Sequence, residues 1–324
     1  MRAAYYDKNG SARDVLSLGE IDTPKPGPGE VRVRLKTSGV NPSDVKSREG
    51  RTRKIAFPRV IPHSDGAGDI EAVGDGVPQS RIGERVWTWN GQWKRAFGTC
   101  ADHIVLPAAL AVKLPDHVSY ESGACLGIPA MTAYHAVAVA GPAKTVLISG
   151  GAGGVGHYAI QFAKARGQTV ITTVSSEAKA KLAREAGADH TIDYKRENLG
   201  ERVMAITNKA GVDSVIEMDF SGNAKMMPSV LHPRSTIVVY GNASGEATIP
   251  SQFFLQNVIT IRYIFVYELT QAERDAAVSA ITAMLERKTL MNNVALTLPL
   301  RDIVAAHEAV EQGKALGNVV VSIE

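Results

Sequence analysis

The chain has 324 residues, of which 44% are hydrophobic and 21% are charged. At about 100–200 residues per domain, this length predicts two domains, or one large domain with an insertion. The composition is ordinary for a folded protein and excludes a disordered or low-complexity chain. The 36 basic and 33 acidic residues leave a net charge of +3 without a long run of like charge. We therefore expect neither nucleic acid nor a membrane as a partner.

The cysteine content and the hydrophobic pattern restrict the environment of the protein. Cys100 and Cys125 are the only cysteines, which is too few for a disulfide framework or a multi-cysteine zinc site. Residues 1–30 lack a basic stretch followed by an apolar core, and no stretch reaches about 18 apolar residues. We expect no secretory signal and no transmembrane helix, and hence a cytoplasmic protein.

The first third of the chain has the pattern of a β-rich domain. Up to about Ser122, short apolar runs are separated by proline and glycine, and the turn-forming residues 24–29 precede a run that alternates with period two. The predicted strands are residues 31–35, 85–89 and 103–106. Many short strands between turn residues are typical of a barrel or a sandwich.

After Glu121 the pattern changes to alternating strands and helices. A strand at residues 145–149 leads through a glycine-rich turn into a helix that Gly167 ends. Further buried strands are expected at residues 169–174, 213–218 and 236–240, which implies a parallel sheet covered on both faces. The tail carries helical patterns at residues 272–287 and 301–312 and ends in a strand at 318–323, which could return to the first domain.

The glycine-rich turn at residues 151–156 fits the pattern G-x-G-x-x-G. Its position between a predicted strand and a predicted helix makes the pattern more specific. Glycine lets the backbone turn tightly and approach a pyrophosphate, and the helix N-terminus supplies unpaired N–H groups and a partial positive charge. The turn therefore predicts a dinucleotide site, and the alternative is a turn that only packs a helix on a sheet.

The end of the second strand of this domain distinguishes NADP from NAD. Ser175 and Ser176 follow that strand, with Lys179 close behind. Hydroxyls and a lysine suit a 2′-phosphate. Glu177 could instead reach a ribose, although an acid in the first turn of a helix also interacts favourably with the helix dipole. The pattern favours NADP, and the alternative for Lys179 is an ordinary solvated helix face.

Several motifs in order carry a family resemblance. They are Gly39-Val40-Asn41-Pro42-Ser43-Asp44 followed by Arg48 and Gly50, the segments 62–68 and 129–134, Tyr194 fifteen residues after Lys179, and the segment 241–245. With these motifs the chain resembles the quinone oxidoreductase (zeta-crystallin-like) branch of the medium-chain dehydrogenase/reductase superfamily, nearly from end to end.

The resemblance implies an α/β fold, with a Rossmann doubly wound parallel sheet and a GroES-like β-rich substrate domain. The substrate domain would span residues 1–124, the NADP-binding domain 125–263, and a C-terminal return to the substrate domain 264–324. It also implies NADPH as cofactor, a homodimer, and reduction of a small electrophilic molecule, a quinone or an enone.

The turn, the phosphate-site residues and the resemblance together give the expected cofactor contacts. They are Asn41, Thr132, Gly151, Gly153, Gly154, Val155, Gly156, Ser175, Ser176, Lys179, Tyr194, Gly241, Asn242 and Asn318. By similarity, Tyr194 would flank the adenosine phosphate, while Asn41 and Thr132 would lie near the nicotinamide.

Two departures from the family pattern bear on the chemistry. Zinc-dependent relatives place a cysteine in the first block and His-Glu in the second, whereas this chain has Asn41, Ser64 and Asp65 there, with His63 one position away. Catalytic zinc takes about three protein ligands, so we expect no metal. The basic segment 51–54 stands where many relatives carry an aromatic residue, which counts against simple quinone specificity.

Without a metal, reduction of a carbonyl group lacks its usual Lewis acid. Conjugate reduction is easier to rationalise, because hydride adds to the β-carbon of an electron-poor alkene or quinone and the cofactor carries that chemistry. The expected catalytic residues, which would polarise the acceptor oxygen, are Asn41, Arg48 and His63, with Lys46 as a further candidate. The alternatives are solvated surface positions for Arg48 and Lys46 and a hydrogen-bonded structural role for His63. Asp44 could transfer a proton or only order its loop.

Two further features and two other functions stay open. Trp87, Trp89 and Trp93 could line an aromatic pocket, with core packing as the alternative. Residues 258–264 could form an edge strand that pairs across a dimer, although an internal strand is the plainer interpretation. The other functions are an NAD(P)-dependent alcohol dehydrogenase and a structural or sensing protein that binds NADPH without turnover.

Overall fold

A computed structural model describes residues 1–313 and 315–323 and divides the chain into two compact units. The first unit consists of Met1–Pro129 and Val278–Glu324, and the second of Ala130–Ala277. The domain boundaries expected at residues 124 and 263 stay a prediction. None of the helices in the described ranges is long and apolar enough to cross a membrane.

The first unit is built on a mainly antiparallel seven-stranded sheet in the order β14-β15-β3-β4-β5-β7, with β6 also paired to β3, and β1 and β2 form a separate pair. Its strands are β1 (Arg2–Tyr5), β2 (Ser17–Glu20), β3 (Glu30–Val40), β4 (Asp65–Val73), β5 (Arg85–Thr88), β6 (His103–Pro107), β7 (Ala111–Lys113), β14 (Val294–Pro299) and β15 (Asn318–Ser322). The strands predicted at residues 31–35, 85–89 and 103–106 are confirmed.

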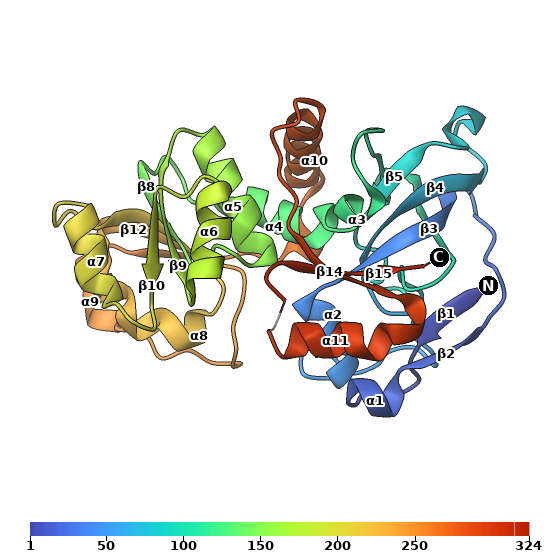
Figure 1. The fold of residues 1–324 in the computed structure, drawn as a ribbon, viewed down its shortest axis with the longest axis horizontal. Coiled ribbons are helices and arrows are strands. Elements are labelled where there is room, and N and C mark those ends of the chain that lie inside the picture. The colour runs from blue at the N-terminus through green and yellow to red at the C-terminus, as the bar shows by residue number, and fades with distance from the viewer. Residues whose placement is uncertain (314, 324) are drawn as a thin grey trace. The chain divides into compact units, whose positions relative to one another are not determined.

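The alternation of β3 decides which of its faces is buried. Val31, Val33 and Leu35 are almost fully buried in one apolar core, as a period of two requires. The C-terminal strand β15 pairs antiparallel with β3 and parallel with β14, and Figure 1 shows it between those two strands. The last segment of the chain therefore contributes to the sheet formed by the first.

The helices of the first unit are short, and one of them begins at the candidate substrate site. They are α1 (Ala12–Val15), α2 (Pro42–Glu49), α3 (Tyr120–Gly123) and α11 (Ile303–Glu311). Asn41 caps α2, Pro42 occupies its first position, and Gly50 ends it in a left-handed conformation with φ of 79°. Helix α10 (Gln271–Glu286) runs from the second unit into the first.

The second unit is a six-stranded parallel sheet in the order β10-β9-β8-β11-β12-β13. Its strands are β8 (Thr145–Ile148), β9 (Thr169–Val174), β10 (His190–Asp193), β11 (Val212–Glu217), β12 (Leu231–Val239) and β13 (Thr260–Tyr263). From β8 the strands are added in one direction as far as β10, and β11 then begins the other half of the sheet on the opposite side of β8. The boundary between β8 and β11 is therefore the switch point at which doubly wound folds bind their ligands. The predicted Rossmann sheet is confirmed.

Helices and turns cover both faces of this sheet. They are α4 (Met131–Val139), α5 (Gly154–Ala165), α6 (Glu177–Glu185), α7 (Leu199–Ile206), α8 (Phe220–Asn223) and α9 (Ser251–Gln256). Leu147 of β8 packs in a core with α7, α8 and α9, while its neighbours Val146 and Ile148 are also fully buried. Successive side chains of a strand point to opposite faces, so both faces are buried.

The short helical turns complete the elements of both units. They are η1 (Gln79–Arg81), η2 (Ala108–Leu110), a π-turn η3 (Leu126–Ala130), η4 (Ala224–Ser229), η5 (Val266–Glu268) and η6 (Leu300–Asp302).

The interpretation that residues 258–264 form an internal strand is wrong. The segment 258–264 forms β13, which pairs with β12 alone among the described strands and therefore lies at the edge of the sheet, not inside it. Its side chains reflect this position, since Tyr263 is 61% exposed. An apolar, β-branched run predicts a strand but does not reveal how many neighbours that strand has.

Candidate functional site

The glycine-rich turn lies at the carboxyl end of β8, as the sequence predicts. Gly153 caps α5 without a side-chain hydrogen bond, so the amides of the first helical turn have no side-chain acceptor at the cap. The backbone N–H of Gly151 donates to the carbonyl oxygen of Thr173 on the neighbouring strand at 3.1 Å. The turn thus presents a helix N-terminus, where the backbone amides and the helix dipole favour an anion.

Two positions of this turn have no room for a side chain. A Cβ at Gly151 would lie 2.2 Å from the hydroxyl of Thr172, and one at Gly156 would lie 2.2 Å from the carbonyl oxygen of Gly150. The glycines therefore serve close packing of the turn and helix on the sheet, as a dinucleotide-binding turn requires. Close packing of this turn is compatible with binding of a dinucleotide.

The residues expected to contact the 2′-phosphate come together at the ends of β9 and β10. The ammonium group of Lys179 donates to the hydroxyl of Ser175 at 3.1 Å, and Ser176 caps α6. The backbone N–H of Tyr194 donates to the carbonyl oxygen of Val174 at 3.1 Å, which fixes its 54% exposed side chain beside the same strand end. A cation, hydroxyls and an exposed ring form a suitable phosphate subsite.

Glu177 has a different role in the structure. Its carboxylate, at the start of α6, pairs with Arg184 on the following turns of the same helix. The acid therefore stabilises the helix through its dipole and an ion pair. This arrangement supports the preference for NADP that the sequence indicates.

The sequence indicated Asn242, which follows β12, but it did not reveal the buried acid at the end of β11. The carboxylate of Glu217 is fully buried and accepts from Ser149 Oγ at 2.6 Å and from the backbone N–H of Asp219 at 2.6 Å. Asn242 accepts from the backbone N–H of Ser221 at 3.2 Å. An acid at the end of an apolar strand has no distinctive spacing, so only the fold shows that Glu217 ties the end of β11 to the end of β8.

The remaining predicted cofactor residues are divided between the units. Thr132 lies on α4 and Gly241 follows β12 in the second unit. Asn41 and Asn318 belong to the first unit, where Val319 pairs with Val40. Because β15 and β3 are antiparallel, Asn318 and Asn41 are the positions next to this pair on the two chain segments.

A buried polar cluster surrounds Asn41 in the first unit. The side-chain amide of Asn41 donates to Asp65 Oδ2 at 2.7 Å, and its backbone N–H donates to Asp44 Oδ2 at 2.8 Å. The backbone N–H of Ile128 lies 2.9 Å from both oxygens of Asp65. These contacts support the interpretation that Asp44 orders its loop, which was one of the two roles considered for it. Asp65 holds the side-chain amide of Asn41 in place.

Burial changes the proton affinity of both carboxyl groups. It raises the pKa of Asp44 to about 7, although the N–H of Asn41 and the positive charge of Arg53 oppose the rise. Burial also raises the pKa of Asp65 well above the usual range, although the hydrogen bond from Asn41 lowers it. The cluster therefore binds protons more readily than exposed carboxylates do.

The groups around Asn41 do not fit a catalytic zinc ion. Such a site needs about three His, Cys or carboxylate ligands, and the residues that the sequence predicts in place of such ligands are Asn41, Ser64 and Asp65. The carboxylate of Asp65 is already occupied by the N–H donors of Asn41 and Ile128. In residues 1–313 and 315–323, no group of three or more His, Cys, Asp or Glu side chains is placed to hold a metal.

His63 lies in a buried chain of hydrogen bonds. Its Nε2 is 2.9 Å from Nε2 of His307, and its Nδ1 is 2.8 Å from the hydroxyl of Ser38. That hydroxyl contacts Thr99, which donates to the carbonyl oxygen of Asp65 at 2.6 Å. Burial lowers the pKa of His63 to about 3, so the ring is neutral. These contacts support the structural alternative for His63.

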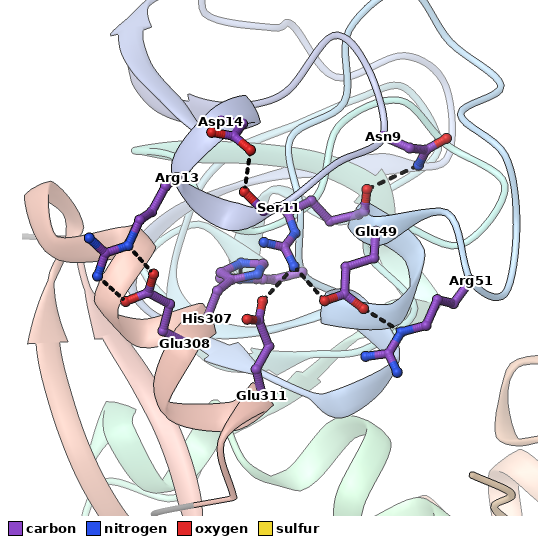
Figure 2. Close-up of polar contacts among 11 residues, drawn as sticks. Asn9, Ser11, Arg13, Asp14, Glu49, Arg51, His307, Glu308 and Glu311 are labelled. Atoms are coloured by element: carbon purple, nitrogen blue, oxygen red, sulfur yellow. Dashed lines mark hydrogen bonds and ion pairs between the residues drawn. The ribbon is translucent and has the colours of Figure 1, made fainter. Parts of the chain in front are cut away.

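Arg48 is fully buried. The alternative that it occupies a solvated surface position is therefore wrong. Its guanidinium pairs with Glu311 of α11 at 2.5 Å and with Glu49 at 3.3 Å. Figure 2 shows Glu49, Glu311 and the ring of His307 close together, with dashed lines that mark the ion pairs of both carboxylates. Arg48 thus joins α2 to α11, which supports a structural role.

The three tryptophans have different surroundings. Trp87 and Trp89 are buried in the first unit, as core packing predicts. Trp93 is half-buried, and the guanidinium of Arg53 stacks over its indole at 5.1 Å from the ring centre. The segment 87–93, which carries the three tryptophans, therefore contacts the basic segment 51–54 through the side chain of Trp93.

Comparison with known proteins places these features in a family context. A family model described as an alcohol dehydrogenase GroES-like domain matches residues 27–116, and one described as a zinc-binding dehydrogenase matches residues 154–283. A 2-haloacrylate reductase from a Burkholderia species is 31% identical over 99% of this chain and 98% of its own length. A quinone oxidoreductase from Pseudomonas aeruginosa is 31% identical over 95% of each chain. The solved structure of Escherichia coli quinone oxidoreductase complexed with NADPH matches over 100% of both chains at 27% identity, with a TM-score of 0.88.

Proposed function

Because the chain belongs to the quinone oxidoreductase family of the medium-chain dehydrogenase/reductase superfamily, we propose that it is a zinc-independent reductase that uses NADPH. Its substrates are quinones or other activated double bonds, such as α,β-unsaturated carbonyl compounds. The observation that carries the proposal is the subsite at the ends of β9 and β10, where Lys179 and Ser175 are in contact. The relatives named as a quinone oxidoreductase and a 2-haloacrylate reductase support the reaction class.

The second unit supplies most of the proposed cofactor contacts. The amides of residues 153–156 would bind the pyrophosphate, and Ser175, Ser176, Lys179 and Tyr194 would hold the adenosine phosphate. Gly241 and Asn242 lie at the carboxyl end of β12, on the same edge of the sheet. When bound, NADPH supplies hydride to an electron-poor carbon.

Asn41 is the proposed catalytic residue of the first unit. Its amide nitrogen has two N–H groups, and one of them is held by Asp65. The second N–H has no acceptor in the described part of the chain, so it can donate to the acceptor oxygen of a substrate. A donor fixed before the reaction stabilises charge that develops on that oxygen.

A panel of substrates tests this function against its alternatives. The loss of the near-ultraviolet absorbance of NADPH and of NADH is followed with quinones, enones, acrylates and simple alcohols or aldehydes. Faster NADPH oxidation with conjugated acceptors is the expected result. Turnover only with alcohols or aldehydes would indicate an alcohol dehydrogenase, and tight NADPH binding without any turnover would indicate a binding protein.

The edge strand β13 supports a homodimer. Its outer edge has no partner strand in the described residues, and Tyr263, Phe265 and Val258 around it are more than half exposed. Exposed edges and apolar patches are typical of association surfaces. Light scattering should give twice the chain mass of 34.5 kDa, and the mass of one chain would contradict the dimer.

A cytoplasmic location remains part of the proposal. Cys100 and Cys125 are both free and buried, and burial raises the pKa of each thiol. Unpaired cysteines are ordinary in a reducing compartment.

A further inference from the structure

The basic segment 51–54 is the feature of the first unit that the proposed function does not yet use. It contains Arg51, Arg53 and Lys54 but no acidic residue. Arg51 is paired with Glu49. In the ranges that the structure describes, Arg53 forms no ion pair with a carboxylate. The positive charge of Arg53 is therefore available to a ligand.

The structure holds this guanidinium in a defined orientation. It stacks on the indole of Trp93 at 5.1 Å from the ring centre and donates through Nη2 to the side-chain oxygen of Gln92. Gln92 is itself buried, and its amide nitrogen donates to the carbonyl oxygen of Arg95 at 2.8 Å. An arginine stacked by its face keeps the N–H groups on its edge for binding.

The loop that carries Trp93 and Gln92 is fixed by an uncommon backbone. Asn90 and Lys94, which flank the pair, have φ of 53° and 57°. Residues other than glycine adopt such angles at a cost, and they persist where the surroundings determine them. The ammonium group of Lys94 also lies 5.6 Å from the centre of the Trp93 ring, so two cations flank one indole.

Arg53 lies near the proposed catalytic residue. Its charge acts on Asp44, whose carboxylate accepts the backbone N–H of Asn41. Both segments belong to the first unit, so this proximity does not depend on the position of the second. Arg53 and Asn41 are thus both held by the first unit and are linked through Asp44.

We propose that Arg53, held by Trp93 and Gln92, binds a carboxylate of the substrate, and that the preferred substrates are acrylate-type α,β-unsaturated acids. This inference rests on the proposed function and narrows its substrate class. The planar guanidinium offers two parallel N–H donors that match a carboxylate. The acid accepts hydride from NADPH at its β-carbon and a proton from solvent at its α-carbon. The products are the saturated acid and NADP⁺, and the carboxylate is unchanged.

A matched pair of substrates tests the charge requirement. 2-Chloroacrylate and its methyl ester share one carbon skeleton, and the ester is the stronger electrophile because it carries no negative charge. A higher kcat/KM for the acid therefore cannot come from intrinsic reactivity. The acid is expected to be the better substrate, by about tenfold or more for one charge-assisted contact.

Three variants assign this preference to Arg53. Arg53→Gln should lower kcat/KM for the acid by about 10–100-fold and leave the ester nearly unchanged, and Arg53→Lys should recover part of the loss. Gln92→Glu places a carboxylate against Arg53 and should also lower use of the acid. Arg51→Gln removes a neighbouring charge that Glu49 already pairs with, so it is the matched control. Circular dichroism verifies that each variant is folded.

The outcomes separate this inference from the proposed function. Turnover of quinones or the ester without preference for the acid, or an equal loss for acid and ester in Arg53→Gln, overturns the carboxylate site alone. Failure of every acceptor overturns the proposed function. In that case tryptophan fluorescence still tests the site, because 2-chloropropionate should quench Trp93 in the wild type and in Arg51→Gln but weakly in Arg53→Gln. The neutral amide of the same acid is the control, and equal quenching by acid and amide overturns the inference.

Discussion

Replacement of Lys179 by glutamine should change the cofactor preference of the protein. The ammonium group of Lys179 donates to the hydroxyl of Ser175 at 3.1 Å, and its side chain is half-buried at the start of α6. Glutamine has a similar reach but no charge. Lys179→Gln therefore removes an ionic contact to a 2′-phosphate and leaves the surrounding helix unchanged.

The size of the effect follows from the kind of contact that is lost. A hydrogen bond to a charged group contributes about 1.5–3 kcal/mol, which corresponds to about 10–100-fold in affinity. NADH has a hydroxyl in place of the phosphate, so its kcat/KM should stay nearly constant. The ratio of kcat/KM for NADPH to that for NADH should therefore fall by about 10–100-fold.

The assay is steady-state oxidation of both cofactors at a saturating, neutral quinone. Lys181→Gln is the matched control, because Lys181 lies on the same helix with 74% of its side chain exposed, 3.9 Å from Glu185. This control should retain the wild-type ratio. An equal loss for NADPH and NADH, or no loss for either, would refute the assignment of the 2′-phosphate to this subsite.

Two other substitutions test the packing of the turn and the buried acid. Gly156→Ala places a Cβ 2.2 Å from the carbonyl oxygen of Gly150, so we expect a loss of NADPH affinity of about tenfold or more, measured by calorimetry with thermal unfolding as the control for folding. For Asp44, the pKa in the folded state is about 7, against an ordinary 3.8. The folded protein thus keeps a proton that the unfolded chain releases between about pH 4 and pH 7, and the wild type loses up to about 4 kcal/mol of stability over that range. Urea unfolding of Asp44→Asn should show a gain relative to wild type that grows from pH 4 to pH 8, and a constant difference would contradict it.

The sequence predicted the second unit in detail because its signals are local. The strand, the glycine-rich turn and the helix around Gly156 follow one another directly, and each has its own periodicity or steric requirement. The same holds for Ser175 and Lys179, which lie four residues apart on the two sides of the first residue of α6. In such cases the spacing along the chain already determines the distance in space.

Contacts between distant segments left no such signal. The rings of His63 and His307 meet although 244 positions separate them, and Arg48 pairs with Glu311 across 263 positions. Burial of a charged or polar side chain depends on a partner that another element brings, so a motif alone could not tell a structural arginine from a catalytic one. The role of Arg53 was hidden for the same reason, because only the fold brings Trp93 against it.

The side chains around Asn41 do not fit a zinc ion, and this affects which substrates the protein can reduce. A zinc ion strongly polarises a carbonyl group and so allows hydride transfer to simple aldehydes and ketones. The amide of Asn41, held by Asp65 at 2.7 Å, offers a neutral N–H donor, which stabilises developing negative charge much less than a metal ion does. The substrate must therefore supply most of the activation through its own conjugation, and a quinone or an acrylate does this while an isolated carbonyl group does not. The guanidinium of Arg53, which we propose binds a carboxylate, then selects among conjugated acceptors by charge.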